Sequence, residues 1–597
     1  MIMNNVLYYN YNKNKISDFN YYYNKGSKDL TSFIMPFLFI RYFKPKVQNN
    51  MDIIIPYYVS DYYQSELLHN NKNMKFTTVV NIGDKEFKKT TYSGEQFINI
   101  GKIETIGETY FSIYTIDENG ISSFVQFFDI LITNENSLKD DEIYIMVEDD
   151  LNTYNITLGD INDVNLAKQN NIGINQLLSN TKNNGYKKII MINDIYTLDY
   201  HENEINPPSN FIVDLNNATF KVTQCNDISS GKMFNIKTVI NTHVINGNLI
   251  GNYKGFDFVT TQTNTGSSIP GEGLSVIDIY GSKYCSFENI KTSNSVGYNI
   301  GVFQDNNNIM IGGLASVKFI NRYYINTVGE EIDSDILSTT DYIDISRLLE
   351  KGEFQVNVYQ GYAGYKGTVA EIFIHFYDGN KNYIRTIKSR QYQICKILDD
   401  NVKYIRITGF TNGDDMDGMN VQYINASKNC ELINIYSKHT RSCAMHPGVY
   451  NHLLIKDCKF DDVASESGEF QVTKLALDFE DGYQYGRNLF FINNEVLKGV
   501  NSLAIVHCFN CNISKNKGFS LDLRGGIKGG NIRSNYFVSS SFPFSTFIKQ
   551  SHGIYDNNSI MFNATFKFDD NLPDTKICLS NCNFHSGVTD NGHLIIS

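Results

Sequence analysis

The most regular pattern in the chain is a series of short strands in which apolar and polar positions alternate, each closed by Asn, Gly or Asp. From Asn210 onward the predicted strands are Phe211–Leu215, His243–Ile250, Ser275–Tyr280, Tyr284–Ile290, Tyr298–Phe303 and Ile309–Gly312. The pattern resumes at Glu431–Tyr436, Leu453–Phe460, Leu489–Asn494, Asn510–Ser514 and Asn531–Phe537. Comparable positions recur about 20–36 residues apart, as coils of a solenoid do: Leu432, Leu454, Phe490, Ile513 and Ile532. Strands of this spacing without intervening helices favour a parallel β-helix over a large antiparallel sandwich.

The gap in this pattern predicts a separate module. Residues 321–418 contain longer alternating strands around an Asp378-Gly379-Asn380 turn, which is typical of antiparallel pairing. We therefore predict a β-sandwich inserted into one coil. It is also a candidate carbohydrate-binding module, although aromatic residues in β-modules more often form the core; the tyrosines considered are Tyr359, Tyr362, Tyr365 and Tyr377.

Patterns before the solenoid predict a leader at 1–45 and a small β domain at 46–150. Residues 151–320 then hold a capping helix and the first part of the β-helix. Ile174, Leu177, Leu178 and Thr181 follow the spacing of one face of a short helix, which ends near 183–185. The second part of the β-helix, with the active site, is expected at 419–560, and a C-terminal segment at 561–597.

Composition limits the classes of function. The net charge of −12 and the lack of long basic clusters argue against nucleic-acid binding. No stretch approaches the roughly 20 apolar residues of a membrane span, and the N-terminus lacks a signal-peptide pattern, so we expect a protein made in the cytosol and kept there or released by lysis. Ten scattered cysteines include a Cys508–Cys511 pair without a matching His pair, which predicts buried thiols and no metal site.

The strongest candidate chemistry lies in the segment 474–482, KLALDFEDG. Leu475, Leu477 and Phe479 share the parity that would face a core, which places Asp478 and Glu480 on the opposite face. Two such carboxylates lie roughly 6–7 Å apart along a strand, a separation at which an acid and a base can act on a glycosidic bond. Asp481 follows at the bend. The alternative is a solvated strand end.

Stacking of coils would bring further charged residues beside this pair. The predicted second strands are Lys438–Met445, Thr473–Glu480, Ser502–His507 and Phe519–Arg524. On one outward face they would carry His439, Arg441, Asp478, Glu480, Asp522 and Arg524. We assign acid–base chemistry to the carboxylates and proton transfer to His446, which closes the first of these strands.

The arginines would clamp an anionic group of the substrate, and His439 and Asp522 would line the same surface. The alternative is an ion-pair ladder that merely satisfies stacked charges.

Two weaker candidates remain. The acidic turn 412–418 is a candidate for a structural Ca²⁺, but it lacks the Glu of a calcium loop, which favours a solvated turn. Glu272 or Asp278, in and after the Thr260–Gly273 loop, is a candidate binding residue.

Several segments resemble one known family. Gly173–Tyr200, with its Tyr196-Thr197-Leu198 coil, resembles the start of the pectate-lyase-like β-helix of bacteriophage tail spikes, and His243–Gly251 is similar to the early coils of that fold. Thr440–Gly448 together with Leu477–Gly482 resembles appendage spikes of short-tailed phages that infect Gram-positive bacteria. The resemblance covers about residues 165–550.

The resemblance implies a mostly β protein: a right-handed parallel β-helix interrupted by a β-sandwich, with a small N-terminal β domain. It also implies a homotrimer in the virion tail that needs no cofactor. The domain at 46–150 would serve in virion attachment, in contact with other phage tail proteins. Its activity would be cleavage of a host cell-wall glycopolymer, with wall teichoic acid as the substrate. The absence of Trp departs from many sugar-cleaving spikes. A receptor-binding spike without turnover and a polysaccharide lyase remain as alternatives.

Overall fold

The computed structural model describes most of the chain from Pro36 onward. The described residues are 36–61, 74–83, 85–118, 120, 122–123, 125–134, 138–201, 203–223, 227–267, 269–305, 310–311, 319–326, 328–334, 337–349, 352–358, 371–390, 394–397, 399, 401–410, 419–423, 425–464, 475–479, 486–505, 508–523, 527–537, 539–543, 552–556, 559–560, 564–567, 576–580, 583–584, 588–589 and 594–596.

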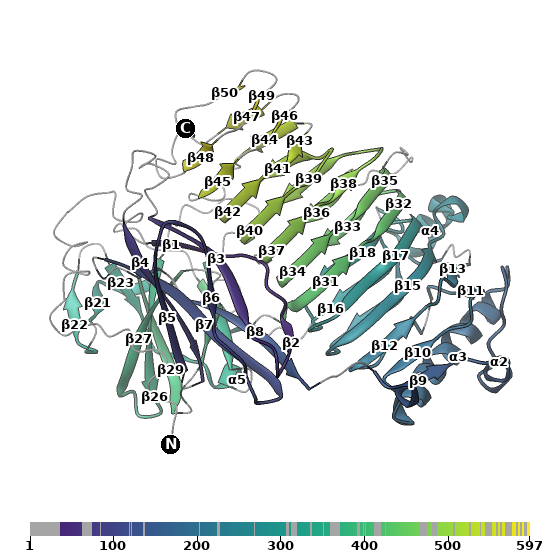
Figure 1. The fold of residues 1–597 in the computed structure, drawn as a ribbon, viewed down its shortest axis with the longest axis horizontal. Coiled ribbons are helices and arrows are strands. Elements are labelled where there is room, and N and C mark those ends of the chain that lie inside the picture. The colour runs from purple at the N-terminus through teal and green to yellow at the C-terminus, as the bar shows by residue number, and fades with distance from the viewer. Residues whose placement is uncertain are drawn as a thin grey trace.

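Parallel strands wind into a solenoid with three faces, which confirms the predicted β-helix (Figure 1). The first face runs through β9 (Ile143–Ile145), β10 (Lys188–Ile190), β12 (Phe211–Asp214), β15 (Thr242–Ile250), β17 (Ser286–Ser295), β31 (Ser427–Ile433), β34 (Tyr450–Lys456), β37 (Gly486–Ile492), β40 (Cys508–Ser514), β42 (Ile527–Arg533), β45 (His552–Asp556), β48 (Lys576–Ser580) and β51 (Leu594–Ile596). The second face contains β11 (Ile195–Leu198), β13 (Thr219–Val222), the later halves of β15 and β17, β32 (Tyr436–Thr440), β35 (Lys459–Val463) and β38 (Glu495–Val496).

The third face is one sheet of ten parallel strands. Its order is β14 (Ser230–Lys237), β16 (Gly273–Tyr280), β18 (Tyr298–Phe303), β33 (Cys443–Pro447), β36 (Leu477–Phe479), β39 (Ser502–Ile505), β41 (Ser520–Leu523), β44 (Ser539–Pro543), β47 (Ala564–Lys567) and β50 (Val588–Thr589). Rungs continue past residue 560, so the predicted boundary of a separate C-terminal segment is not a boundary of the solenoid.

One predicted register differs from the structure by a residue. The inward column on the first face consists of Leu432, Ile455, Phe491, Ile513 and Ile532. Leu454 and Phe490, which the sequence pattern placed in that column, point outward instead. They are still buried because the N-terminal domain covers this face, with the Tyr42 ring centre 5.5 Å from that of Phe490. Burial on both faces removes the alternation that sets register in a strand.

Asparagines stack at the bends between rungs and explain part of the Asn content. Asn494, Asn516 and Asn535 are buried in a ladder. The backbone N–H of Asn494 donates to Oδ1 of Asn516 at 2.8 Å, and that of Asn516 donates to Oδ1 of Asn535 at 2.9 Å. The side-chain amides in turn donate to strand carbonyls of neighbouring coils. Each buried amide thereby satisfies backbone groups that a bend leaves without a sheet partner.

A capping helix covers the first rungs of the solenoid. Helix α3 (Val164–Asn183) is longer than the sequence pattern predicts, and it begins where Asp163 accepts hydrogen bonds from the N–H groups of Asn165 and Leu166. Its predicted apolar positions are buried. The apolar pattern does not reveal the first half of α3, because the buried side chains there include Asn170 and Asn171. Their amides donate hydrogen bonds to backbone carbonyls of the solenoid.

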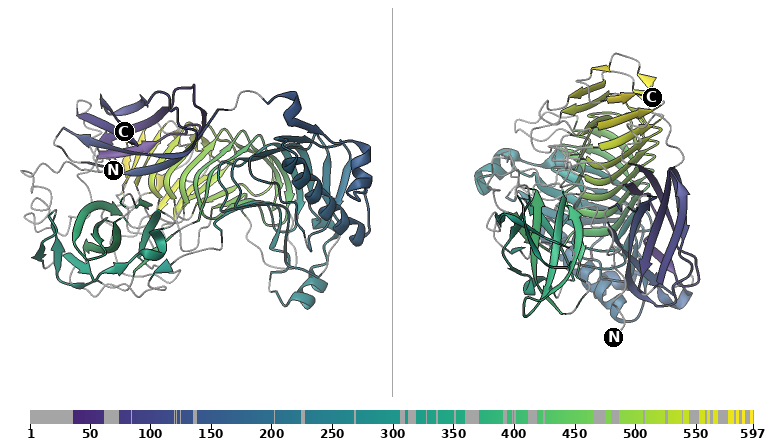
Figure 2. Two further views of the ribbon diagram at one scale, coloured as in Figure 1. Left: turned by 90° about the horizontal axis from the view of Figure 1, so that it is seen from below. Right: turned by 90° about the vertical axis from the view of Figure 1, so that its left-hand side faces the viewer.

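Two β-sandwiches lie side by side against one flank of the solenoid, away from α3 (Figures 1 and 2). The N-terminal domain pairs β1 (Pro36–Ile40), β3 (Ile54–Asp61) and β6 (Gly94–Asn99) in one sheet. Its second sheet has β2 (Lys46–Gln48), β4 (Lys75–Ile82), β5 (Lys85–Tyr92), β7 (Gly107–Asp117) and β8 (Gln126–Thr133). Strand β1 belongs to this domain, so the predicted leader is too long at its end.

The inserted module has two sheets around its own apolar core. One contains β20 (Phe319–Asn321), β23 (Leu337–Thr340), β24 (Ile343–Asp344), β26 (Glu371–Asp378), β27 (Tyr383–Arg390) and β29 (Val402–Phe410). The other contains β19 (Met310–Ile311), β25 (Glu353–Val358), β28 (Cys395–Lys396) and β30 (Met419–Gln422). The antiparallel β26–β27 hairpin confirms the predicted turn after Asp378.

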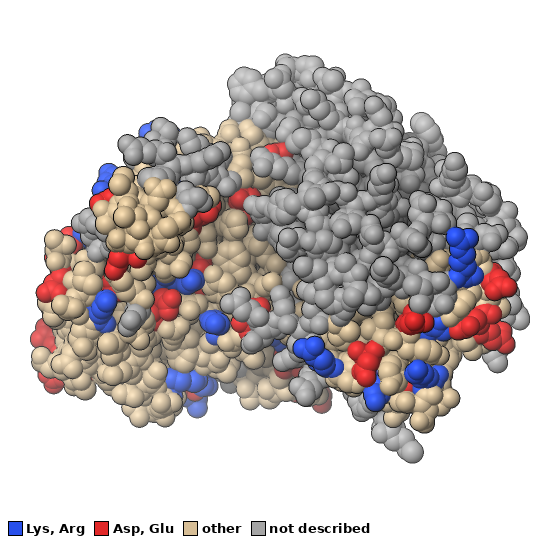
Figure 3. Space-filling view, turned by 180° about the vertical axis from the view of Figure 1, so that it is seen from behind, with Lys and Arg blue, Asp and Glu red and all other residues tan. Residues whose placement is uncertain are grey.

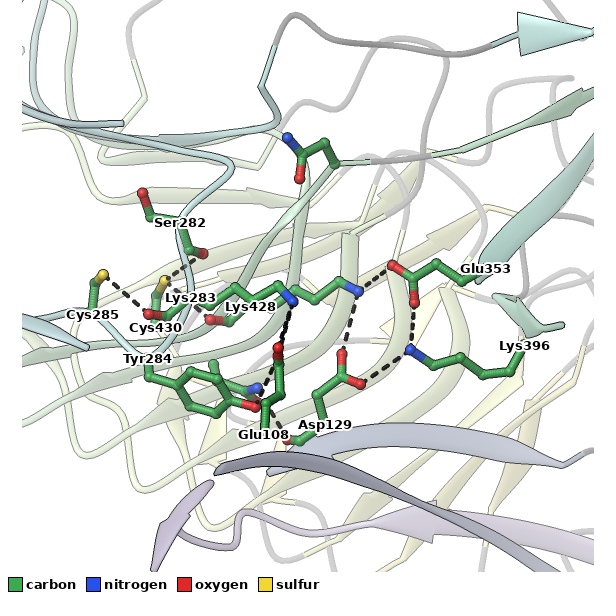
Figure 4. A network of polar contacts seen from close by, with 12 residues as sticks. Glu108, Asp129, Ser282, Lys283, Tyr284, Cys285, Glu353, Lys396, Lys428 and Cys430 are labelled. Carbon is green, nitrogen blue, oxygen red and sulfur yellow. Dashed lines mark hydrogen bonds and ion pairs between the residues drawn. The ribbon is translucent and has the colours of Figure 1, made fainter. Parts of the chain in front are cut away.

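A buried ion quartet joins the three parts of the chain (Figure 4). Asp129 comes from the N-terminal domain, Lys428 from the solenoid, and Glu353 and Lys396 from the inserted module. Lys396 Nζ lies 2.6 Å from Glu353 and 3.1 Å from Asp129, and Lys428 contacts both carboxylates. Burial pushes the pKa of Asp129 upward, but Lys428 and Lys396 outweigh it and hold the pKa well below its usual range. The quartet is therefore charged and fixes the position of both sandwiches.

Candidate functional site

The third face of the solenoid aligns several polar residues in one outward column. Asp278 on β16 pairs with Gly301 on β18, and Gly301 pairs with His446 on β33. Met445 pairs with Leu477 on β36, so His446 and Asp478 occupy the next position on adjacent rungs. The flanking Ile277, Ile300, Met445 and Leu477 point into the core. The column therefore faces outward across successive rungs, each about 4.8 Å from the next.

His446 and Asp478 form a pair at the centre of this column. Nδ1 of His446 lies 3.6 Å from Oδ2 of Asp478. About 25% of the His446 side chain is exposed, whereas Asp478 is nearly covered. Packed rings around the imidazole remove enough water that burial lowers the pKa of His446 to about 4. At pH 7 the imidazole of His446 is therefore neutral and able to accept a proton.

Asp278 lies two rungs from His446 and has no exposed surface. Burial raises its pKa to about 7, with Lys232 opposing the shift. The hydroxyl of Tyr280 donates to its Oδ2 at 3.0 Å, and interactions with Ser275 and Tyr280 also oppose the rise in pKa. Asp278 is thus a carboxyl group that still holds a proton close to neutral pH.

Gly301 makes this crowding possible. It sits between Asp278 and His446 in the column, and a Cβ there would collide with Asp278 Oδ1 and with the rings of Phe303 and Tyr298. Glycine is required because the carboxyl group and two rings approach its backbone closely.

Aromatic rings line the same face beside the polar column. The ring centre of His446 lies 5.4 Å from that of Tyr298, in a stacked arrangement, and 5.6 Å from that of Phe303. Phe303 also stacks on Tyr280 at 5.2 Å. All three aromatic residues are half-buried. A partly exposed aromatic surface next to an imidazole and two carboxyl groups suits the apolar faces and hydroxyls of a sugar.

The remaining residues predicted on this face have different outcomes. Asp522 lies in the same column, two rungs beyond Asp478, because Asp478 pairs with Ala504 and Ala504 pairs with Asp522. Glu480, Asp481 and Arg524 fall outside the described residues. The predicted roles of these residues remain predictions.

Arg441 and His439 do not join the column, which corrects their predicted placement. The expected strand 438–445 is broken by a corner, since β32 ends at Thr440 and β33 begins at Cys443. Arg441 at that corner is fully buried, where its Nη1 donates to the Pro270 carbonyl at 3.0 Å. Its guanidinium also lies 4.3 Å from the ring centre of Phe258 on α4 (Phe258–Thr265), so it is not an exposed substrate clamp.

His439 belongs to the second face. Its Nδ1 lies 2.9 Å from Asp462 on β35, and its ring centre is 5.6 Å from that of Tyr253. It therefore lines a different surface from His446 and Asp478.

Sequence reasoning missed the aromatic residues of the site and treated Asp278 only as a binding candidate. Tyr298 and Phe303 match core-strand residues in pattern, and the inserted module separates β18 from β33 in the sequence. The one available signal was the break in alternation at Gly301, where a small residue stands between Ile300 and Val302.

The described part of the chain contains no group of three or more His, Cys, Asp or Glu side chains arranged to hold a metal ion. The calcium candidate at 412–418 lies outside the described residues. Cys508 and Cys511 are buried thiols. None of the described helices is long and apolar enough to cross a membrane.

No protein-family model matches the sequence, and no curated protein matches it significantly. Solved structures with a similar chain path include a mannuronan C-5 epimerase A-module from Azotobacter vinelandii, at 8% identity and a TM-score of 0.33, covering 76% of this chain and 98% of that one. A putative glycosyl hydrolase from Parabacteroides merdae has 9% identity and a TM-score of 0.29, covering 60% and 98%. Tailspike protein 3 of bacteriophage CBA120 has 11% identity and a TM-score of 0.21, covering 90% and 82%. Such low values leave the chemistry to be argued from this chain's own residues.

Proposed function

We propose that the third face of the solenoid binds and hydrolyses a cell-surface glycopolymer, with wall teichoic acid as the substrate. The observation that carries the proposal is the His446–Asp478 pair, 3.6 Å apart on an aromatic-lined face and two rungs from the protonated Asp278. Hydrolysis of a glycosidic or phosphodiester bond uses one group that donates a proton and one that accepts a proton. Two groups whose surroundings shift their pKa values in opposite directions can fill these roles.

The neutral imidazole of His446 is the proton acceptor in this scheme. It takes a proton from a water molecule whose oxygen bonds to the electrophilic carbon or phosphorus atom, and Asp478 stabilises the resulting imidazolium. The bond to the leaving oxygen breaks as Asp278 donates its proton to that oxygen. Since Asp278 has no exposed surface, the rings of Tyr298 and Phe303 must move aside when the polymer binds.

The biological setting is part of the same proposal. The protein would act as a homotrimeric spike in a phage tail, with the N-terminal domain contacting other tail proteins. The buried quartet that fastens this domain to the solenoid supports such a role, because it holds an attachment domain rigidly against the reactive part of the chain.

A second candidate is a receptor-binding spike without turnover. It is favoured by the burial of Asp278 and Asp478, which have 0% and 3% exposure, because a carboxyl group must reach a bond in order to catalyse its cleavage. In that case the exposed edge of His446 and the half-buried rings of Tyr298 and Phe303 would bind the polymer.

Incubation of the purified full chain with isolated Gram-positive cell walls separates these candidates. Release of glycerol phosphate or free sugar, detected by mass spectrometry, supports hydrolysis, and release should be lost in His446→Gln. Unchanged walls with retained protein would support binding alone. A product that absorbs ultraviolet light through a new double bond would instead identify a lyase.

A further inference from the structure

Three tyrosines form a row across one sheet of the inserted module, far in sequence from the third-face site. Tyr377 on β26 pairs with Tyr383 on β27 and with Tyr404 on β29. Partners directly across a sheet project from the same face. Tyr342, from the loop before β24, packs over this row with its ring centre 4.9 Å from that of Tyr377 and 6.2 Å from that of Tyr404. We call these four residues with Lys381 and Lys403 the tyrosine–lysine patch.

Lysine side chains cover the outer rim of the patch. Lys381, in the turn between β26 and β27, places Nζ 4.7 Å from the ring centre of Tyr342 and 5.7 Å from that of Tyr404. Lys403 places Nζ 5.5 Å from the centre of the Tyr404 ring. Lys381 is exposed, Lys403 is half-buried, and 36% of Tyr342 is exposed. Both ammonium groups are therefore within reach of a ligand at the rim.

The carboxylates near the patch are engaged by other groups. Asp378 accepts the backbone N–H groups of Asn380 and Asn382 and the Asn382 amide, which shapes the turn. Asp344 accepts hydrogen bonds from the backbone N–H and hydroxyl of Ser346, which together with a weaker attraction to Lys403 lower its pKa.

Below the rim, the buried Arg406 pairs with Glu331 at 2.6 Å. Among the described residues, no carboxylate forms an ion pair with Lys381 or Lys403. The two rim ammonium groups thus hold positive charge over aromatic rings.

We propose that the tyrosine–lysine patch is a second polymer-binding site, specific for glycan or polyol chains that carry phosphate or carboxylate groups. The ammonium groups would meet the anions, while the exposed tyrosine edges contact sugar carbons and hydroxyls. On the face shown in Figure 3, by contrast, basic and acidic side chains of the described residues are interspersed. The site is independent of the cleavage proposed for the third face.

Binding by the full-length protein to three immobilised probes tests this proposal: polyglycerol phosphate, polygalacturonate and neutral dextran. We expect both anionic probes to bind, more weakly as salt rises, and dextran to bind poorly. Comparison of the two anionic probes distinguishes phosphate from carboxylate as the preferred group. The double variant Lys381→Gln/Lys403→Gln should weaken binding to the anionic probes at least tenfold, and Tyr342→Leu at least threefold.

A matched control is available in the N-terminal domain. Lys89 lies 4.1 Å from the ring centre of exposed Phe97, an equivalent lysine–aromatic pair, so Lys89→Gln should leave binding unchanged. The lysine variants replace side chains at the protein surface, and thermal unfolding checks that they remain folded. Binding should persist in His446→Gln, which keeps this test separate from that of hydrolysis.

Four results would overturn the proposal: wild-type protein that binds none of the probes, equal binding of dextran, a double variant that binds as well as the wild type, or an equal loss in Lys89→Gln. A double variant that changes the sedimentation coefficient would assign the patch to contact between copies of the chain instead.

Discussion

Two regions of this molecule bury carboxyl groups, and they treat them in opposite ways. At the junction of the three domains, Asp129 and Glu353 face two lysines, and the four groups form a closed ring of ion pairs. On the third face, Asp278 is buried as completely, but no described cation forms an ion pair with it. Burial therefore raises its pKa to about 7, whereas the lysines hold the pKa of Asp129 low.

This difference separates a structural device from a chemical one. A buried carboxylate with two cationic partners keeps its charge at every physiological pH and cannot exchange a proton usefully. A buried carboxyl group without such a partner titrates near neutral pH, where proton transfer is most efficient. Charged residues of similar burial thus serve assembly in one region and reactivity in the other.

The largest expected effect concerns the reactive region. His446→Gln removes the proton acceptor, and a loss of about 10²–10⁴-fold in the rate of polymer release is expected for a general base. The measurement is the initial rate of glycerol phosphate or sugar release from cell walls.

Two further measurements sharpen this prediction. His243→Gln, a half-buried histidine on the first face, should retain the wild-type rate. Because the scheme needs neutral His446 and protonated Asp278, the wild-type rate should rise near pH 4 and fall near pH 7. A rate that increases steadily above pH 8 would exclude Asp278 as the acid.

Next in size is a break in the ion quartet. Lys428→Met leaves Asp129 and Glu353 sharing Lys396 alone, and removing one partner from a buried ion pair typically costs about 3–5 kcal/mol. We expect a lower unfolding temperature and faster proteolysis at the domain junction.

A paired substitution tests whether charge balance is the cause. Lys428→Met/Glu353→Leu leaves one cation beside one anion, so it should be more stable than Lys428→Met. If the double variant were the less stable of the two, packing around the side chains would matter more than their charges.

Asp278→Asn is expected to change stability in a pH-dependent manner. The pKa of Asp278 is higher in the folded state, about 7, than the ordinary value of 3.8, so folding stability falls as pH rises between these values. The full shift corresponds to about 4 kcal/mol, an upper limit for the gain that a neutral amide brings above pH 7.

The unfolding temperature of Asp278→Asn should thus exceed that of the wild type at pH 8 and equal it near pH 4. Asp333→Asn, on the exposed strand β22 (Glu331–Asp333), serves as the control with no such trend. An equal gain at both pH values would show that the carboxyl group is not the titrating element.

The sequence was sufficient for the architecture because inward residues repeat rung by rung. Leu432, Ile513 and Ile532 do lie in one core column. Leu454 and Phe490 were assigned to the wrong parity, since the N-terminal domain buries the outer face there. The residues around Phe490 do not indicate that Tyr42, several hundred positions earlier in the chain, packs on its outer side.

For the site, only the part between adjacent coils was predictable. Stacking of successive strands correctly brought Asp478 beside the strand of His446. The link to Asp278 was not predictable, because the inserted module interrupts the chain between Gly301 and its register partner His446. Arg441 was misplaced by a corner of two residues, which turns its side chain toward α4 and into a buried contact.

The smallest expected effect comes from an exposed ion pair whose distance equals that of Lys396 and Glu353 in the quartet. Lys221 Nζ lies 2.6 and 2.7 Å from the two oxygens of Asp160, and Lys396 Nζ lies 2.6 Å from Glu353. The side chains of Lys221 and Asp160 are 37% and 60% exposed, however, so water and salt screen the attraction between their charges. We expect Lys221→Met to cost no more than about 1 kcal/mol, measured as the shift in unfolding temperature relative to Lys428→Met. A loss as large as that of Lys428→Met would mean that short distance, and not burial with an unpaired charge left behind, sets the energy of these pairs, and the contrast between the two regions would lose its physical basis.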